Sequence, residues 1–162
     1  MTSAIYPIAL DQDRELAAEI GLLLSAYAII DLFILHIYSL VSGQDKDASN
    51  IVLGRIKSTG QRIDLIRELL KLSGRPEKDY ELELLAKIAS ANQLRNQYAH
   101  AIYSQVTASP TGWRMSMWLS DGSRRKKEFK DISVQSVRQD GEFVRSVVES
   151  LFHFGGIAVA YE

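Results

Sequence analysis

Residues 20–41 read IGLLLSAYAIIDLFILHIYSLV, a run in which apolar side chains occupy nearly every side of a helix. We expect this run to form the centre of a helix that Asp11 or Asp13 caps and that Gly43 ends. A helix that is apolar on all sides must be covered on more than one side. The run therefore predicts a helical bundle, and it indicates that a second subunit supplies part of the cover.

A transmembrane span is the alternative interpretation of the same run. Asp31 lies near its middle, where an ionised side chain costs about 2.5 to 3.5 kcal/mol on membrane-insertion scales. Further polar side chains add to that cost, namely Ser25, His36 and Ser39. We therefore predict a helix that is buried in protein and a chain that does not enter a membrane.

The composition of the chain predicts one globular domain that covers residues 1–162. A net charge of −1 gives no long-range field that attracts nucleic acid, so such a partner requires a local basic patch. The absence of cysteine excludes disulfides, thiolate zinc sites and cysteine nucleophiles. Residues 1–10 lack the regions of a signal peptide, and we predict a cytoplasmic protein.

Two further helical patterns follow the first. One extends over residues 51–70, and the Ser58-Thr59-Gly60 segment inside it is expected to weaken or kink the helix. The other starts near Pro76 or Glu77 and continues to about His100.

After the third helical pattern, apolar residues no longer recur at helical spacing but at every second position, as in a strand. Large apolar residues recur at every second position, at Trp113, Met115, Met117 and Leu119. With the turn signal Asp121-Gly122, they predict a β-hairpin at about 112–130. Ser133 can cap a last helix, which Gly155-Gly156 closes. The predicted fold class is all-α: a four-to-five-helix up-down bundle with a small β-hairpin inserted before the last helix.

Residues 93–103 gather the side chains that can support chemistry at the end of the third helical pattern. Cleavage of RNA at its own 2′-hydroxyl needs a base, an acid for the leaving 5′-oxygen and a cation that stabilises the crowded phosphate. Histidine exchanges protons near neutral pH, and arginine is a permanent cation that grips phosphate. We predict His100 as the base or acid, Arg95 as the phosphate clamp and Asn96 as the residue that orients the imidazole or the ribose.

The spacing of this pair adds a constraint. Five positions on an ideal helix leave Arg95 and His100 about 140° apart. Convergence therefore needs a break in the helix, the long reach of arginine, or a two-fold axis that brings His100 of one subunit near the motif of the other. The reaction needs both a base and an acid, and one such histidine per chain cannot be both at the same time. A homodimer supplies two and is therefore chemically attractive.

The segment Arg95-Asn96-Gln97-Tyr98-Ala99-His100 resembles the motif of the HEPN superfamily, an arginine, a polar residue, three variable positions and a histidine. Its members are small helical bundles with the same order of elements. The resemblance implies a metal-independent endoribonuclease that works as a homodimer, with both motifs lining one cleft and with Arg95, Asn96 and His100 as catalytic residues. Many members are toxins or phage-defence effectors, so an antitoxin or another regulatory protein is an implied partner.

Two groups of residues are candidates for binding single-stranded RNA. Tyr98 and Tyr103 could stack on bases, or they could pack at the edge of the bundle. Residues 114–130 contain six basic and two acidic side chains, a local charge of +4. Trp113, next to that segment, or Trp118, inside it, could stack on bases. Four consecutive cations could grip phosphates, namely Arg124, Arg125, Lys126 and Lys127. The alternative is that these cations prevent aggregation through an edge strand.

Structural roles also remain open for the motif. His100 could be a hydrogen-bonded histidine at a helix C-terminus, and Arg95 could neutralise Asp31 in a buried pair. The alternative function is a non-catalytic dimer of the same fold that binds nucleic acid or a protein. The histidines lack zinc-binding spacing and no phosphate-binding glycine loop is present, so we predict no metal and no cofactor.

Overall fold

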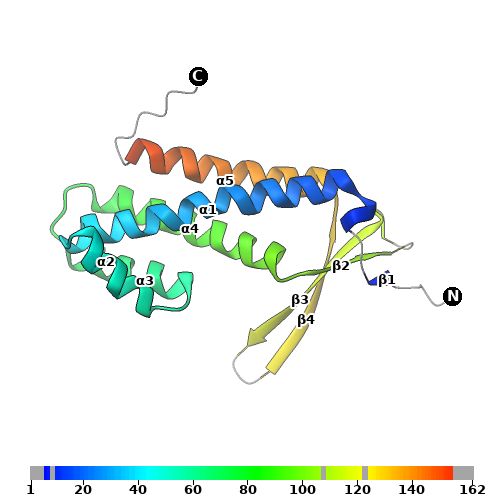
Figure 1. Ribbon diagram of the computed structural model, residues 1–162, viewed down its shortest axis with the longest axis horizontal. Coiled ribbons are helices and arrows are strands. Elements are labelled where there is room, and N and C mark those ends of the chain that lie inside the picture. Colours follow the sequence, from blue (N-terminus) through cyan, green and yellow to red (C-terminus); the bar gives the residue numbers. More distant parts are fainter. Residues whose placement is uncertain (1–5, 8–9, 107–108, 122–123, 155–162) are drawn as a thin grey trace. The chain divides into compact units, whose positions relative to one another are not determined.

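The computed structural model describes residues 6–7, 10–106, 109–121 and 124–154, with the backbone alone for 6–7, 11, 118–121 and 124–127. Within these ranges the helices are α1 (Arg14–Ser42), α2 (Lys46–Arg55), α3 (Thr59–Leu72), α4 (Lys78–Ala99) and α5 (Val134–Phe154) (Figure 1). The strands are β1 (Tyr6–Pro7), β2 (Ile102–Gln105), β3 (Trp113–Asp121) and β4 (Arg124–Ile132). The predicted fold class is confirmed, since helices dominate and a small antiparallel sheet precedes the last one.

The chain divides into two compact units. The first comprises residues 1–24 and 94–142, and it contains the sheet. The second comprises residues 25–93 and 143–162, and the regular elements of its described part are helices. Each unit has its own buried apolar side chains, for example Met115 and Val137 in the first and Ile66 and Leu85 in the second. The prediction of a single domain remains a prediction.

α1 begins and ends at residues that the sequence predicts. The Asp13 carboxylate accepts a hydrogen bond from the Leu16 amide at 3.0 Å, so Asp13 is the cap. Gly43 has a φ of 68°, and its amide donates to the Ser39 carbonyl at 3.0 Å. This left-handed conformation favours glycine and ends the helix.

The rest of the chain buries only part of the α1 surface. Ile20, Ile30 and Ile37 are buried, whereas Leu22 and Leu32 are 55% and 74% exposed. Coverage of the exposed side by a second subunit therefore remains a prediction. Among the described residues, α1 is the one helix that is long and apolar enough to cross a membrane, a test that the core helices of soluble proteins also pass.

The helical pattern over residues 51–70 contains two helices instead of one kinked helix. α2 ends at Arg55, and α3 starts at Thr59 with Ser58 as its cap. The Ser58 hydroxyl accepts a hydrogen bond from the Gln61 amide at 3.2 Å. The expected kink is therefore a full interruption, because this hydroxyl supplies a partner for a free amide at a new helix start.

A buried carboxylate anchors the start of α4 in the second unit. Glu81 is 2% exposed and accepts hydrogen bonds from Arg75 Nη2 at 2.7 Å and from Arg75 Nε at 2.9 Å. Arg75 Nη1 also lies 3.4 Å from the Leu40 carbonyl oxygen. The hydrogen bond with Glu81 raises the pKa of Arg75 above its ordinary value. The guanidinium thus compensates the buried charge and links the loop before α4 to the end of α1.

Replacement of Glu81 tests this anchor. We expect Glu81→Ala to lower the free energy of unfolding by about 2 kcal/mol, because the partly buried Arg75 loses its partner. Glu83→Ala is the matched control, since Glu83 is exposed and pairs with Lys87 only one turn away on the same helix. The free energy of unfolding of Glu83→Ala should fall by less than about 0.5 kcal/mol. Equal losses in the two variants, measured by urea unfolding, would contradict the anchoring role.

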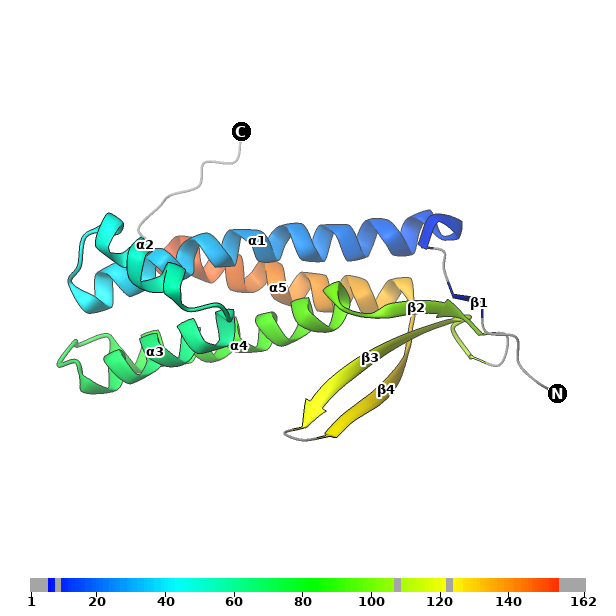
Figure 2. The same cartoon turned by 60° about the horizontal axis from the view of Figure 1, so that its bottom comes forward.

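The four strands form one antiparallel sheet in the order β1-β2-β3-β4 (Figure 2). The predicted hairpin is confirmed as β3 and β4, whereas β1 and β2 were not predicted. Trp113, Met115 and Met117 are buried and share one face of β3, as their alternation predicts. The predicted turn residue Gly122 and the predicted stop Gly155-Gly156 lie outside the described residues.

The start of α5 is fixed by side chains of the first unit. The Ser133 hydroxyl accepts a hydrogen bond from the Ser136 amide at 3.1 Å, which confirms the predicted cap. Arg138 donates to Glu19 at 2.8 Å and to Glu15 at 3.2 Å, so the first turns of α5 and of α1 are joined by ion pairs.

Two glycines offer a paired test of the backbone. We expect Gly43→Ala to destabilise the protein by about 1 kcal/mol, because a β-carbon strains the left-handed conformation. Gly54→Ala should cause no loss, since Gly54 lies in helix α2 and a β-carbon there meets nothing within 4 Å. Thermal unfolding of both variants is the measurement. A stable Gly43→Ala variant would show that the φ of 68° is not required.

Candidate active site

The motif residues lie at the end of α4, within the first unit. Arg95 and Asn96 are in the last turns of the helix, and His100 is the first residue after it. Asn96 and His100 are exposed, and Arg95 is half-buried. Arg95 Nη1 donates to Asn96 Oδ1 at 3.0 Å, and the His100 amide donates to the Asn96 carbonyl at 3.2 Å. The asparagine therefore contacts both of the other motif residues.

The functional groups of the motif are available to a ligand. Within the described part of the first unit, no carboxylate lies within ion-pair distance of Arg95, and the His100 imidazole has no side-chain hydrogen bond. The alternative of a hydrogen-bonded structural histidine is thus not supported, although the position at a helix C-terminus is as predicted. A guanidinium and an exposed imidazole at one helix end can contact an anion and exchange a proton.

Arg95 belongs to the first unit and Asp31 to the second, and a pair between these two side chains stays a prediction. Asp31 is exposed, and its carboxylate lies 3.5 Å from the Thr59 hydroxyl in the second unit. The Asp31 carboxylate therefore does not have the buried position that the alternative of a buried pair assumes.

α4 continues without interruption from Lys78 to Ala99. A break between Arg95 and His100, one of the three ways to bring the pair together, is therefore excluded. The His100 amide also keeps the helical bond to the Asn96 carbonyl, so its backbone continues the helical path. The reach of the arginine side chain and a second copy of the motif are the routes that remain.

Tyr98 does not have the exposed position that base stacking requires. It is 2% exposed, and its hydroxyl donates to Asp140 Oδ2 on α5 at 2.7 Å. Lys130 Nζ lies 3.6 Å from the same oxygen. The prediction that Tyr98 binds substrate is therefore corrected: its ring is part of the core, and its hydroxyl joins α4 to α5.

Tyr103 is half-buried, and its hydroxyl donates to the carbonyl oxygen of Tyr98. This carbonyl belongs to the last turn of α4, where intrahelical donors are missing. Tyr103 thus stabilises the helix end that carries the motif, and stacking on RNA by its ring remains a prediction. Asp140 was not predicted, because it lies 42 residues from Tyr98 and no local pattern connects them.

The predicted basic cluster Arg124–Lys127 occupies the first half of β4. The register places Lys127 opposite Trp118 and Arg124 opposite Asp121, and β4 is the last strand of the sheet. The side chains of these four cations lie outside the described part of the structure, so their contact with RNA stays a prediction. The alternative role, the prevention of aggregation through an exposed strand edge, assumes that these cations lie on an edge strand, and β4 is one.

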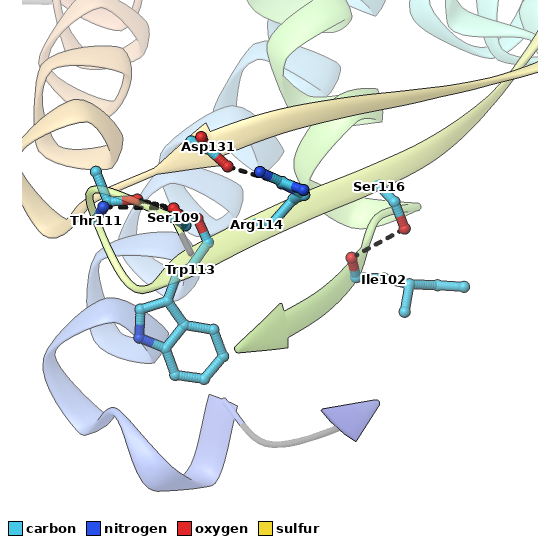
Figure 3. Close-up of polar contacts among 7 residues, drawn as sticks. All are labelled: Ile102, Ser109, Thr111, Trp113, Arg114, Ser116 and Asp131. Carbon is cyan, nitrogen blue, oxygen red and sulfur yellow. Dashed lines mark hydrogen bonds and ion pairs between the residues drawn. The ribbon is translucent and has the colours of Figure 1, made fainter. Parts of the chain in front are cut away.

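Polar contacts hold the base of the β3–β4 hairpin (Figure 3). Arg114 Nε donates to Asp131 Oδ1 at 2.8 Å, and this bond lowers the pKa of Asp131. The Ser116 hydroxyl lies 3.4 Å from the Ile102 carbonyl oxygen on β2. Trp113 is 7% exposed, so stacking on a base by this ring is excluded.

The second unit contains a cavity of about 220 Å³ lined by Asp31, Asn50, Arg62 and apolar side chains. None of the predicted site residues lines it. Among the described residues, no group of three histidine or acidic side chains is arranged to hold a metal ion.

Comparison with known proteins gives no match to a family model, to a curated protein or to a solved structure.

The two tyrosines generate a prediction about pH. Burial, and for Tyr98 also the hydrogen bond to Asp140, raises the pKa of both phenols above the ordinary value of about 10. A raised pKa in the folded state contributes stability that is complete below about pH 10 and is lost as the pH rises through the folded value. Phenolate absorbance should therefore show Tyr98 and Tyr103 among the late-ionising tyrosines.

Tyr98→Phe and Tyr103→Phe should each remove one phenol from the late-ionising group. If either variant instead loses a phenol that ionises near pH 10, the buried position of that tyrosine is contradicted.

Proposed function

We propose that this chain is a metal-independent endoribonuclease that cleaves single-stranded RNA at a composite site formed by two copies. The observation that carries the proposal is the exposed helix end on which Arg95, Asn96 and His100 meet. Within the described part of the first unit, the Arg95 guanidinium has no carboxylate partner and the His100 imidazole has no side-chain hydrogen bond. The resemblance of the motif to the HEPN superfamily supports the same function.

The chemistry assigns one role to each side chain. Arg95 binds the phosphate and stabilises the charge that develops on it. His100 removes the proton of the 2′-hydroxyl, or it gives a proton to the 5′-oxygen that leaves. Asn96 contacts Arg95 at 3.0 Å and positions the guanidinium for the phosphate.

A second copy completes the site. One chain supplies one histidine on an unbroken helix, whereas the reaction needs a base and an acid. Two motifs related by a two-fold axis supply two imidazoles and two guanidiniums. A role as a toxin or a phage-defence effector under the control of a regulatory protein belongs to the same proposal.

Cleavage of single-stranded RNA in EDTA tests the function. We expect wild-type protein to cleave, and we expect His100→Ala and Arg95→Ala to lower the rate at least about 100-fold. His153→Ala and Arg55→Ala are matched controls, because both residues are exposed and lie outside the motif. The controls should cleave at the wild-type rate.

An intact RNA in the wild-type reaction, or equal rates in all variants, would refute the ribonuclease. Binding without cleavage would support the alternative of a non-catalytic dimer. The specific activity of the wild-type protein should also fall on dilution, since the proposed active species is a dimer. A concentration-independent specific activity would contradict the composite site.

A further inference from the structure

Gln97 lies inside the motif segment, and the proposed function gives it no role. Its neighbours on both sides are engaged. Asn96 accepts a hydrogen bond from Arg95, and Tyr98 donates one to Asp140. Within the described part of the first unit, the Gln97 carboxamide makes no hydrogen bond. It therefore keeps one acceptor and two donors for a ligand.

The carboxamide of Gln97 is open to solvent. Among the described residues that are not exposed, no side-chain nitrogen or oxygen is both buried and without a hydrogen-bond partner. Gln97 is half-buried and its carboxamide has no partner, so the polar atoms are accessible while the aliphatic stem is partly covered. A side chain with a covered stem loses less conformational entropy when its polar end binds a ligand.

Gln97 borders the exposed face of the helix end on which His100 lies. Asn96, Ala99 and His100 are the exposed residues of this turn. Residues three apart on a helix are neighbours with Cβ atoms about 5 to 6 Å apart, which is the spacing of Gln97 and His100. The spacing applies because the His100 amide keeps the helical bond to the Asn96 carbonyl. The Gln97 carboxamide and the His100 imidazole can therefore contact the same group of a ligand.

The helix geometry decides which group of the RNA the carboxamide meets. Around the helix axis, Gln97 is about 160° from Arg95 but only about 60° from His100. In the proposed function Arg95 binds the phosphate, and His100 as the base contacts the 2′-hydroxyl. Gln97 is therefore placed for the 2′-hydroxyl and not for the phosphate.

A carboxamide suits this hydroxyl chemically. A hydroxyl has one proton and two acceptor lone pairs. When the imidazole takes the proton, the Gln97 nitrogen can donate a hydrogen bond to a lone pair of the same oxygen. This contact holds the oxygen and leaves its proton to the imidazole. DNA lacks the hydroxyl, so the same contact distinguishes RNA from DNA.

We propose that Gln97 is a substrate-positioning residue that binds the ribose 2′-hydroxyl beside His100 and gives the site a preference for RNA over DNA. The inference rests on the proposed function for the identity of the ligand. Loss of the carboxamide lowers the affinity for RNA and leaves the affinity for DNA unchanged, because only RNA has the group that it binds.

Binding of two labelled single-stranded oligonucleotides, one of RNA and one of DNA with the same sequence, tests this role. The measurement uses His100→Ala protein, so that the RNA stays intact, and adds the second substitution to it. Gln97→Leu and Gln97→Ala should each weaken RNA binding about fivefold, because one hydrogen bond is lost. DNA binding should not change. Gln135→Ala is the matched control, an exposed glutamine on α5 that should affect neither affinity.

Cleavage by protein with an intact His100 is the second measurement. Gln97→Leu should lower the rate of RNA cleavage at least about tenfold, because the nucleophile is no longer held in place. Leucine keeps an apolar stem of similar size, so a loss in this variant does not come from lost packing. A purely structural role would weaken the binding of RNA and of DNA equally.

An unchanged ratio of RNA affinity to DNA affinity in both Gln97 variants, or no binding of either oligonucleotide by the parent, would overturn the positioning role. Cleavage by Gln97→Leu at the wild-type rate would overturn it as well and leave the ribonuclease standing. If wild-type protein cleaves no RNA, the ribonuclease is refuted. A lost preference for RNA in the Gln97 variants would then still support the contact with the 2′-hydroxyl.

Discussion

The hydrogen bond from the buried Tyr98 hydroxyl to Asp140 fixes the end of α4 within the first unit. Tyr103 adds a bond to the Tyr98 carbonyl, so the last turn of the helix and the second residue of β2 are joined. All motif residues lie within three positions of Tyr98. Because the backbone of Arg95 and His100 is held by this network, the binding of a ligand does not have to order it.

Local signals explain which parts of the fold were predictable. Asp13, Gly43 and Ser133 act within three or four residues of their partners, and the structure confirms all three. β1 and β2 contain two and four residues, which is too short for alternation to be recognised. The interruption at residues 56–58 was expected only as a kink, since the apolar spacing continues across it while the Ser58 cap acts locally.

The candidate site was predictable where its residues are neighbours in the sequence. Arg95, Asn96 and His100 fall within six positions, so their chemistry can be recognised without a structure. Burial of Tyr98 depends on tertiary packing and on Asp140, a partner from another helix, and sequence spacing does not report either.

The position of β4 at the edge of the sheet restricts how copies of the chain can assemble. An edge strand offers free backbone groups with which a second edge can pair. Where two β4 strands overlap through residues 124–127, the four cations of one copy face the same cations of the other, and like charges across paired strands are unfavourable. Association of two copies through this half of β4 is thereby disfavoured, and the four cations protect the edge of the sheet at which they lie.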